Sequence, residues 1–240
     1  MHVQTLIFAM LIVLLASPPA AAQDPPANTE GGNGDSGVSR KGIGYLIGYL
    51  NMAGSTNANA FRPLKQSERN RLYLKSLINP FGYVKAGFSA GLDQWNDKPR
   101  EWEQGASGYG KRYANIIGQY MIQRTLTFGL ESALHEDNRY FGSGKKGFWP
   151  RTGYGLASGL LARHDDGSRH LSISQMGGVA GSAFLSRLWQ PPSQDSAGDA
   201  AVSFGITMST NIGFGVVKEF LPDLARAITG KNRPKPVPSH

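Results

Sequence analysis

The chain has 240 residues, a formal net charge of +8 and no cysteine. This length leaves room for a single domain with a sizeable core. The lack of cysteine excludes disulfides, thiolate metal sites and a lipid-modified N-terminal cysteine. The positive charge suits an anionic partner, and for an exported chain we expect lipid headgroups or cell-wall polymers rather than nucleic acid. No run of four basic residues occurs, so scattered charges that only confer solubility are the alternative.

The first 22 residues contain no Lys, Arg, Asp or Glu and include an apolar segment at 6–16. That length is typical of the core of a signal peptide and is too short to cross a bilayer. The alanines at 20–22 supply the small residues that signal peptidase needs. The opening residues lack the usual Lys or Arg, so a helical anchor is the alternative. We expect a signal peptide at 1–22 and a location in the periplasm or outer membrane.

The rest of the chain divides into three parts by composition. Residues 23–40 are rich in Pro, Gly, Asn and Ser, which predicts a flexible linker. Residues 230–240 form a basic tail whose prolines exclude a helix past Arg233. We expect residues 41–229 to form a single helical domain.

Apolar residues recur at steps of three and four through much of this domain, which predicts helices. The first predicted helix begins near Ser67, and the second runs from Asn79 to Trp95. The third runs from Gly105 toward Phe141, the fourth from Tyr154 to Arg163 and the fifth from Leu171 to Trp189. The last runs from Asp199 toward Arg226, with a bend near Pro222.

The stretch 105–141 is the longest of these and the centre of the predicted fold. Residues from Tyr113 to His135 recur along one of its faces. Further leucine, isoleucine and methionine side chains make it apolar on most sides, and such a helix is usually covered on most sides. Asn138 and Gly142 lie where we expect it to end.

Residues 202–216 carry apolar side chains at every even position except Thr210 and mostly small or polar ones at odd positions. A period of two is a strand signal, and this alternation is typical of a membrane-embedded barrel. Against a strand, 218–227 is an amphipathic helix by pattern, and no comparable alternation occurs elsewhere. We therefore predict an all-α, glycine-rich helical bundle with one long central helix, with a small outer-membrane β-barrel as the alternative.

The chain contains 31 glycines, close to twice the usual share. Several lie four residues apart, as at Gly155 and Gly159 and at Gly177 and Gly181. This spacing lets helix backbones approach closely, as membrane helices do. We therefore expect a tight bundle that lies on a membrane or partly in it.

Two groups of residues are candidates for chemistry. In the first, an imidazole stands beside carboxylates, the pairing that general acid–base catalysis or a metal site requires. In the second, imidazoles and carboxylates in a turn are candidate ligands for a divalent ion. Acidic residues with Asn and Gly are also ordinary at helix ends and turns. The catalytic candidates are His135, Glu136 and Asp137 with Glu131 one helical turn earlier, and the metal candidates are His164, Asp165, Asp166 and His170.

No cofactor-binding motif is present, and we expect no cofactor. The chain lacks the HExxH zinc motif, a phosphate-binding loop with its Lys and Ser/Thr, and the GxSxG serine elbow. The identity of a small-molecule ligand stays open.

Several sequence blocks occur in a characteristic order: SER-RLY at 67–73, GYGKR at 108–112 and HEDNRYF at 135–141. In these blocks the chain resembles a family of exported bacterial proteins to which no activity is attached. The resemblance implies export and a shared fold over residues 63–223, and nothing about chemistry. Asn138 stands where the family pattern has proline.

We expect an exported envelope protein with a structural or binding role at a membrane surface. The alternative is an envelope hydrolase or metal-dependent enzyme that uses His135, Glu136 and Asp137.

Overall fold

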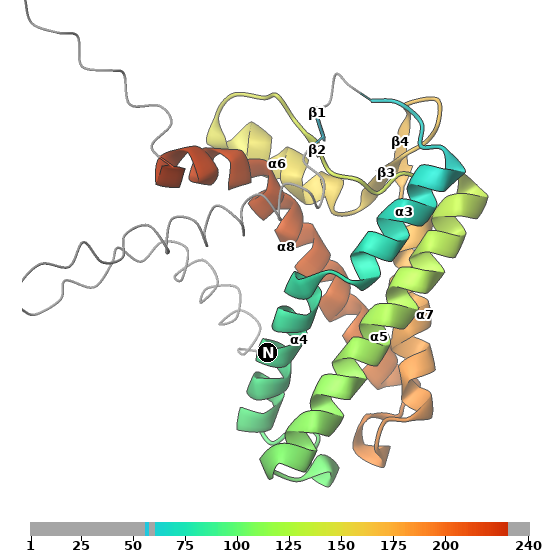
Figure 1. The fold of residues 1–240 in the computed structure, drawn as a ribbon, viewed down its shortest axis with the longest axis vertical. Coiled ribbons are helices and arrows are strands. Elements are labelled where there is room, and N and C mark those ends of the chain that lie inside the picture. Colours follow the sequence, from blue (N-terminus) through green and yellow to red (C-terminus); the bar gives the residue numbers. More distant parts are fainter. Residues whose placement is uncertain (1–55, 58–60, 230–240) are drawn as a thin grey trace, which may run out of the picture. The chain divides into compact units, whose positions relative to one another are not determined.

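The structure is a computed structural model that describes residues 56–57 and 61–229. The predicted signal peptide, linker and C-terminal tail lie outside the described residues. The described part is mostly helical (Figure 1), which confirms the all-α prediction. Its helices are α3 (Gln66–Leu77), α4 (Pro80–Trp95), α5 (Gly105–Leu134), α6 (Phe148–Ser158), α7 (Ile173–Leu185) and α8 (Ala197–Thr229).

Strands and 3-10 turns are short and connect these helices. Strand β1 (Thr56–Asn57) pairs in parallel with β2 (Phe141–Gly142), and β3 (Leu161–Arg163) pairs antiparallel with β4 (Arg169–Leu171). The 3-10 turns are η2 (Arg100–Trp102), η3 (Ser186–Leu188) and η4 (Pro192–Gln194). The helix predicted from Tyr154 to Arg163 ends at Ser158, and the hairpin β3–β4 begins at Leu161.

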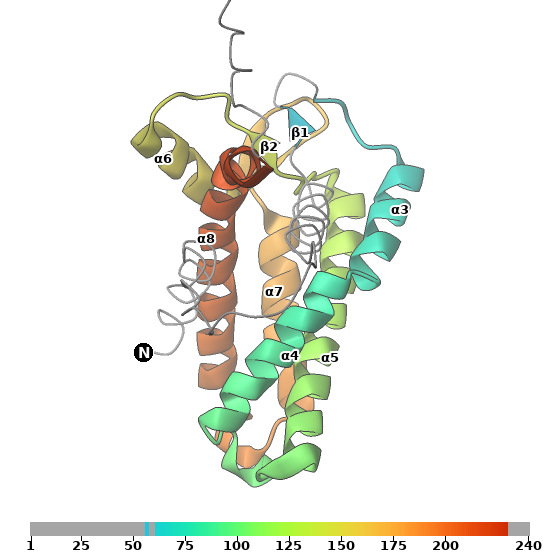
Figure 2. The same cartoon turned by 60° about the vertical axis from the view of Figure 1, so that its left-hand side comes forward.

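The long helix α5 lies at the centre, as predicted. It packs against α4 on one side and α7 on another, while α8 packs against α7 and α6. Figures 1 and 2 show that the end of α4, the start of α5, the end of α7 and the start of α8 lie together at the lower end of the bundle. We call this the lower end.

Glycines set the distance between the paired helices. A Cβ atom built at Gly178 of α7 would overlap the hydroxyl of Thr127 in α5, and one at Gly177 would lie 2.6 Å from a methyl of Leu130. In the second pair, a Cβ at Gly155 of α6 would lie 2.8 Å from the Cα of Val216 in α8. The predicted close approach of backbones at glycine is confirmed at both interfaces.

The strand interpretation of residues 202–216 is wrong, because these residues lie within α8. In a helix, apolar residues at every even position form two rows with a step of four. One row contains Met208, which is buried, and the other contains Val202 and Ile206, which are 61% and 36% exposed. The alternation therefore produces a helix that is apolar toward the bundle and also toward its outside. The helix continues through Pro222, and its last turns run in another direction (Figure 1).

Helix α5 ends at Leu134, seven residues before the predicted end at Phe141. His135 adopts the left-handed conformation, with φ 55°, and its N–H bonds the carbonyl of Glu131. This local reversal terminates the helix. The chain after it runs in extended form past the start of α7.

The connection between α4 and α5 is held by Arg112, whose side chain is fully buried. Its guanidinium donates to the carbonyls of Lys98 at 2.7 Å, Glu103 at 2.7 Å and Pro99 at 2.9 Å, and to the side chain of Gln94. These bonds tie the carbonyls of the turn to one side chain, and the Pro99 carbonyl also accepts a backbone N–H bond from Trp102. The lower end is therefore built around one buried cation.

The close α5–α7 contact predicts opposite effects for two Gly→Ala substitutions. Gly178→Ala should lower the free energy of unfolding by about 1–3 kcal/mol, because the new methyl overlaps α5. Gly129→Ala, in α5 with nothing within 4 Å of the added atom, should raise it by up to about 1 kcal/mol through helix propensity. Thermal and denaturant unfolding followed by far-UV circular dichroism measure both. Equal effects of the two substitutions on the free energy of unfolding would show that the contact at Gly178 does not limit how closely α5 and α7 pack.

Candidate functional site

Glu136, one of the predicted catalytic residues, caps helix α7. Its carboxylate is buried and accepts N–H bonds from Ile173 at 3.1 Å and Ser174 at 2.9 Å, together with the Ser174 hydroxyl. The first N–H groups of a helix have no partner within it, and the positive end of the helix dipole favours an anion there. The carboxylate thus joins the end of α5 to the start of α7.

Asp137 and Asn138 are engaged in the same way. The Asp137 carboxylate accepts from Arg139 Nε at 2.9 Å and Nη2 at 2.6 Å, and its backbone pairs with Arg163. The Asn138 amide donates to Glu131 and to Ser174, both at 2.8 Å. Burial raises the pKa of Glu131. The side chains of Asp137 and Asn138 are thus hydrogen-bonded to other protein groups.

Arg69 of α3 completes this cluster from the other side. Its buried guanidinium donates to the carbonyls of Glu131 and Glu136, and its Nη2 lies 3.6 Å from an Asp165 carboxylate oxygen. A cation at the carbonyl end of α5 is favourable because the negative end of the helix dipole lies there. Arg69 thus ties α3, α5 and the β3–β4 hairpin together.

The imidazole and carboxylate side chains of the two candidate groups contact different partners and do not form one cluster. His135 is 70% exposed at its side chain and places Nδ1 3.1 Å from Asp165. Asp166 accepts from the backbone and hydroxyl of Ser168, within its own turn. The rings of His164 and His170 meet edge to face at 5.3 Å. Among the described residues no three His, Asp or Glu side chains gather as a metal site would require. The catalytic role of His135, Glu136 and Asp137 stays a hypothesis.

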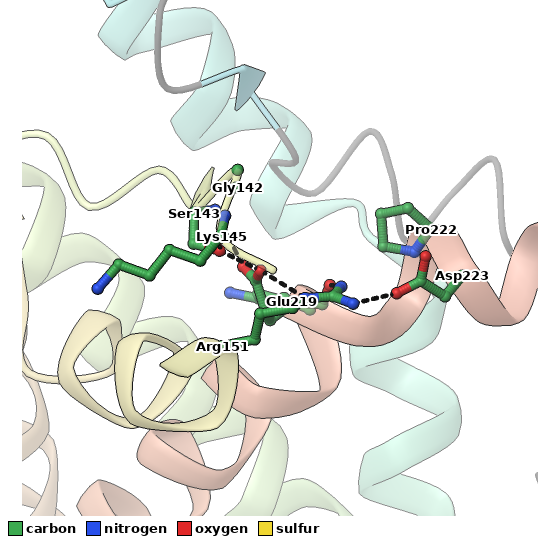
Figure 3. A pocket seen from close by; sticks show the side chains of 9 residues that line it. Gly142, Ser143, Lys145, Arg151, Glu219, Pro222 and Asp223 are labelled. Carbon is green, nitrogen blue, oxygen red and sulfur yellow. Dashed lines mark hydrogen bonds and ion pairs between the residues drawn. The ribbon is translucent and has the colours of Figure 1, made fainter. Parts of the chain in front are cut away.

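Sequence reasoning missed a further buried carboxylate, Glu219 of α8. Figure 3 shows it bonded to Ser143 and Arg151, and Arg151 reaches on to Asp223. The Tyr140 hydroxyl also donates to it. Burial opposes ionisation of Glu219, but hydrogen bonds from Ser143, Tyr140 and Arg151 outweigh it and lower its pKa.

These residues line an open depression of about 260 Å³. Glycines 142 and 144 with Lys145 form one of its walls, and Lys218 and Pro222 of α8 form another. Because Arg151 is already paired with both Glu219 and Asp223, the depression is a junction between α6, α8 and the loop before α6. In the sequence, Lys218 and Glu219 are the first charged residues after the charge-free stretch 200–217, and this isolated pair was the signal that could have indicated the buried carboxylate.

Large apolar side chains are concentrated on the outside of the bundle. Trp95 is 89% exposed and Leu188 is 82% exposed. The side chains in full burial are instead polar or small, and Val179 is the only aliphatic one among the largest fully buried side chains of the described residues. We define the apolar belt as a set of exposed apolar residues on α4, α7, α8 and the turn that follows α7, namely Phe88 and Trp95 of α4, Phe184 and Leu185 of α7, Leu188 of η3, Trp189 directly after it, and Val202 and Ile206 of α8.

Helix α8 contributes most to this character. Its segment Ala197–Asp223 has the length and apolarity of a helix able to cross a membrane. The core helix of a soluble domain also meets that criterion, but such a helix is mostly buried. Only 17% of the most apolar 18-residue stretch of α8 is buried. Most of its residues are therefore exposed or only partly covered by the rest of the described chain.

Comparison of the chain with models of protein families, with curated proteins and with solved structures found no match. The family resemblance stays a prediction, and function has to be inferred from the geometry.

The capping role of Glu136 predicts a change in stability. Glu136→Gln should lower the free energy of unfolding by about 1–3 kcal/mol, because the amide turns a donor toward N–H groups that need an acceptor. The matched control is His135→Asn, an exposed neighbour whose left-handed backbone Asn tolerates, and its effect should stay within about 0.5 kcal/mol. Chemical denaturation measures both. A neutral Glu136→Gln would contradict the capping role.

Proposed function

We propose that this chain is an exported envelope protein that associates with a membrane surface through the apolar belt and has a structural or binding role there. The observation that carries this proposal is the distribution of side chains. Small and polar residues predominate among the buried side chains, and many large apolar residues are exposed. Membrane helices pack in this way, because lipid covers their large side chains and small residues let the backbones meet.

The energy of transfer supports attachment. Moving one fully exposed large apolar side chain out of water gains about 1.5–3 kcal/mol. Several belt residues together are therefore sufficient to hold the protein at a lipid surface. Trp95 and Trp189 lie within the belt, and tryptophan is the side chain that most favours the boundary between lipid and water.

Charged residues near the lower end nearly balance one another. Five are basic and six are acidic, so we expect attachment there to depend on apolar contact and to change little with salt. They are Lys98, Arg100, Lys111, Arg112 and Arg187, and Asp93, Asp97, Glu101, Glu103, Asp195 and Asp199.

The test is co-sedimentation of the exported protein with phosphatidylcholine vesicles, which carry no net charge. The triple variant Trp95→Gln, Leu188→Gln and Val202→Gln should bind at least about tenfold more weakly, because each change removes part of the apolar transfer energy. Tryptophan fluorescence of the bound wild-type protein should shift to shorter wavelength as Trp95 leaves water.

The matched control replaces three exposed apolar residues outside the belt by Gln: Leu74, Ile78 and Leu171, which are 60%, 75% and 55% exposed. This control should bind as the wild type does. Equal loss in both triple variants, or no binding by the wild type, would refute attachment through the belt.

A further inference from the structure

The hairpin β3–β4 brings two arginines opposite each other across its strands. In the antiparallel register, Arg163 at the end of β3 is the direct partner of Arg169 at the start of β4. Directly opposite side chains stand on the same face of the ribbon, with their Cβ atoms about 4.5–5.5 Å apart. Like charges in such a pair destabilise it unless a counter-charge joins them. The register therefore places both guanidinium groups within reach of one ligand.

The two arginine side chains also line one pocket, which lies between the hairpin, helix α6 and the chain after α5. Its volume of about 10 Å³ is enough for a single water-sized atom. Neither arginine is buried. A ligand can therefore place its oxygen atoms beside the guanidinium groups while the rest of it stays in solvent.

Aromatic rings hold the two guanidinium groups in place. The guanidinium carbon of Arg163 lies 4.6 Å from the ring centroid of Phe141 and 5.3 Å from that of Phe61. The guanidinium carbon of Arg169 lies 4.6 Å from the ring centroid of Tyr154, whose hydroxyl donates to the carbonyl of Phe141. A guanidinium that lies over a ring still presents its N–H groups along its edge. Both arginines are thus oriented before a ligand arrives.

The described part of the chain offers these two arginines no counter-charge. None of its ion pairs includes Arg163 or Arg169, and neither side chain forms a hydrogen bond within it. The carboxylate that lines the pocket, Asp137, instead accepts from Arg139 Nε at 2.9 Å and Nη2 at 2.6 Å. Three arginines and one aspartate line the pocket, so two positive charges are left over.

The two carboxylates of the hairpin turn are engaged elsewhere as well. Asp165 places one carboxylate oxygen 3.1 Å from His135 Nδ1 and the other 3.6 Å from Arg69 Nη2. Asp166 accepts from the backbone and the hydroxyl of Ser168. Both aspartates lie within three residues of an arginine of the pair, yet neither neutralises it. The position between the two arginines is open to an anionic ligand.

We propose that Arg163 and Arg169 bind the phosphate group of a phosphate monoester. Such a group carries between about 1.5 and 2 negative charges at pH 7, which matches the two charges left over in the pocket. Each guanidinium can donate two parallel N–H bonds to phosphate oxygens. A carboxylate carries a single charge and would neutralise only half of the pair.

Two leucines provide the contacts for the organic part of the ester. Leu161 lines the same pocket, and Leu171 is its direct partner across the hairpin. Both stand on the face of the ribbon that carries the arginines, because residues two apart in a strand share a face. Leu171 is 55% exposed. The pocket therefore favours a monoester with an apolar organic group over inorganic phosphate.

The position of the hairpin favours a water-soluble ligand over a lipid. Figure 1 shows β3 and β4 beside the end of α5, away from the lower end. Helix α5 has 30 residues, so its ends are about 45 Å apart. Trp95 of the apolar belt is the last residue of α4 and lies at the lower end. A bilayer that covers the lower end leaves the arginine pair in water, and the site does not depend on the proposed membrane function.

The first experiment titrates the exported protein with phenyl phosphate in a calorimeter, at constant ionic strength and in phosphate-free buffer. Arg169→Glu should bind at least about tenfold more weakly than the wild type, because charge-assisted bonds are lost and a carboxylate faces Arg163. The variant should stay folded by far-UV circular dichroism, since opposite charges across a strand pair are favourable. Benzoate has the same ring with one charge and should bind the wild type more weakly than phenyl phosphate.

The matched control is the double variant Arg71→Gln, Arg100→Gln, which changes two exposed arginines elsewhere. It lowers the net charge by two, as Arg169→Glu does, and should bind phenyl phosphate as the wild type does. No binding by the wild type, or equal binding by the Glu variant and the control, would overturn the site. If Arg169→Glu does not fold, Arg163→Lys decides, because it keeps the charge and loses the fork. Binding undiminished by that change would also overturn the site.

The second experiment identifies the source of the phosphate. Vesicles of phosphatidylcholine are compared with vesicles that also contain phosphatidic acid, whose headgroup is a phosphate monoester. Arg169→Glu and the charge-matched control should gain equally from phosphatidic acid, because only their common net charge acts there. A gain that the control keeps and Arg169→Glu loses would overturn the water-soluble source in favour of a lipid headgroup.

The outcomes also separate this site from the proposed function. Binding of phenyl phosphate without binding to any vesicle would support the arginine site and refute membrane association. Binding to phosphatidylcholine without binding of phenyl phosphate would overturn the arginine site and leave membrane association standing.

Discussion

The contact of α5 with α7 is the constraint on which the rest of the bundle depends. Gly177, Gly178 and Gly181 let the two backbones approach so closely that side chains of α5 fill the space a Cβ would take. Once that distance is set, little volume remains between the helices for large side chains. Alanine, serine and glycine therefore occupy much of the inside beside a few larger side chains such as Met208 and Leu221, and many large apolar residues of α4, α7 and α8 are exposed. The apolar belt is a consequence of the glycine packing.

Buried polar groups hold the ends of the helices in this arrangement. Glu136 caps α7, Arg69 meets the carbonyl end of α5, and Arg112 closes the turn between α4 and α5. Each satisfies backbone groups that helix ends leave without partners. A small-residue interior provides little hydrophobic volume to select one arrangement. These directional bonds specify which helix end meets which.

Much of the fold follows from local pattern. The limits of α4 and the start of α5 agree with apolar spacing and with the Asn79–Pro80 signal, and the glycine pairs do mark helix contacts. The end of α5 does not follow in the same way. His135 reverses the chain because Glu136 and Asp137 find partners at Ser174 and Arg163, far along the sequence. No periodicity contains that information.

The candidate residues show the same limit. An imidazole followed by two carboxylates has the composition of a reactive site and also of a helix terminus, and only the distant serines of α7 decide that Glu136 is a cap. Likewise, an alternation with a period of two gives one apolar face in a strand but two apolar rows in a helix. The tertiary contacts of α8 bury Met208 in one row and leave Val202 and Ile206 in the other exposed.

The inverted distribution of side chains also bears on how the protein responds to temperature. The heat capacity of unfolding arises mainly from apolar surface newly exposed to water. In the absence of lipid, the belt residues are already hydrated in the folded chain, so unfolding adds less such surface than in a domain of ordinary composition and equal length. The stability curve of this bundle in water is accordingly flatter, with a weaker tendency toward cold denaturation. Covering the belt would restore the steeper curvature of a conventional core.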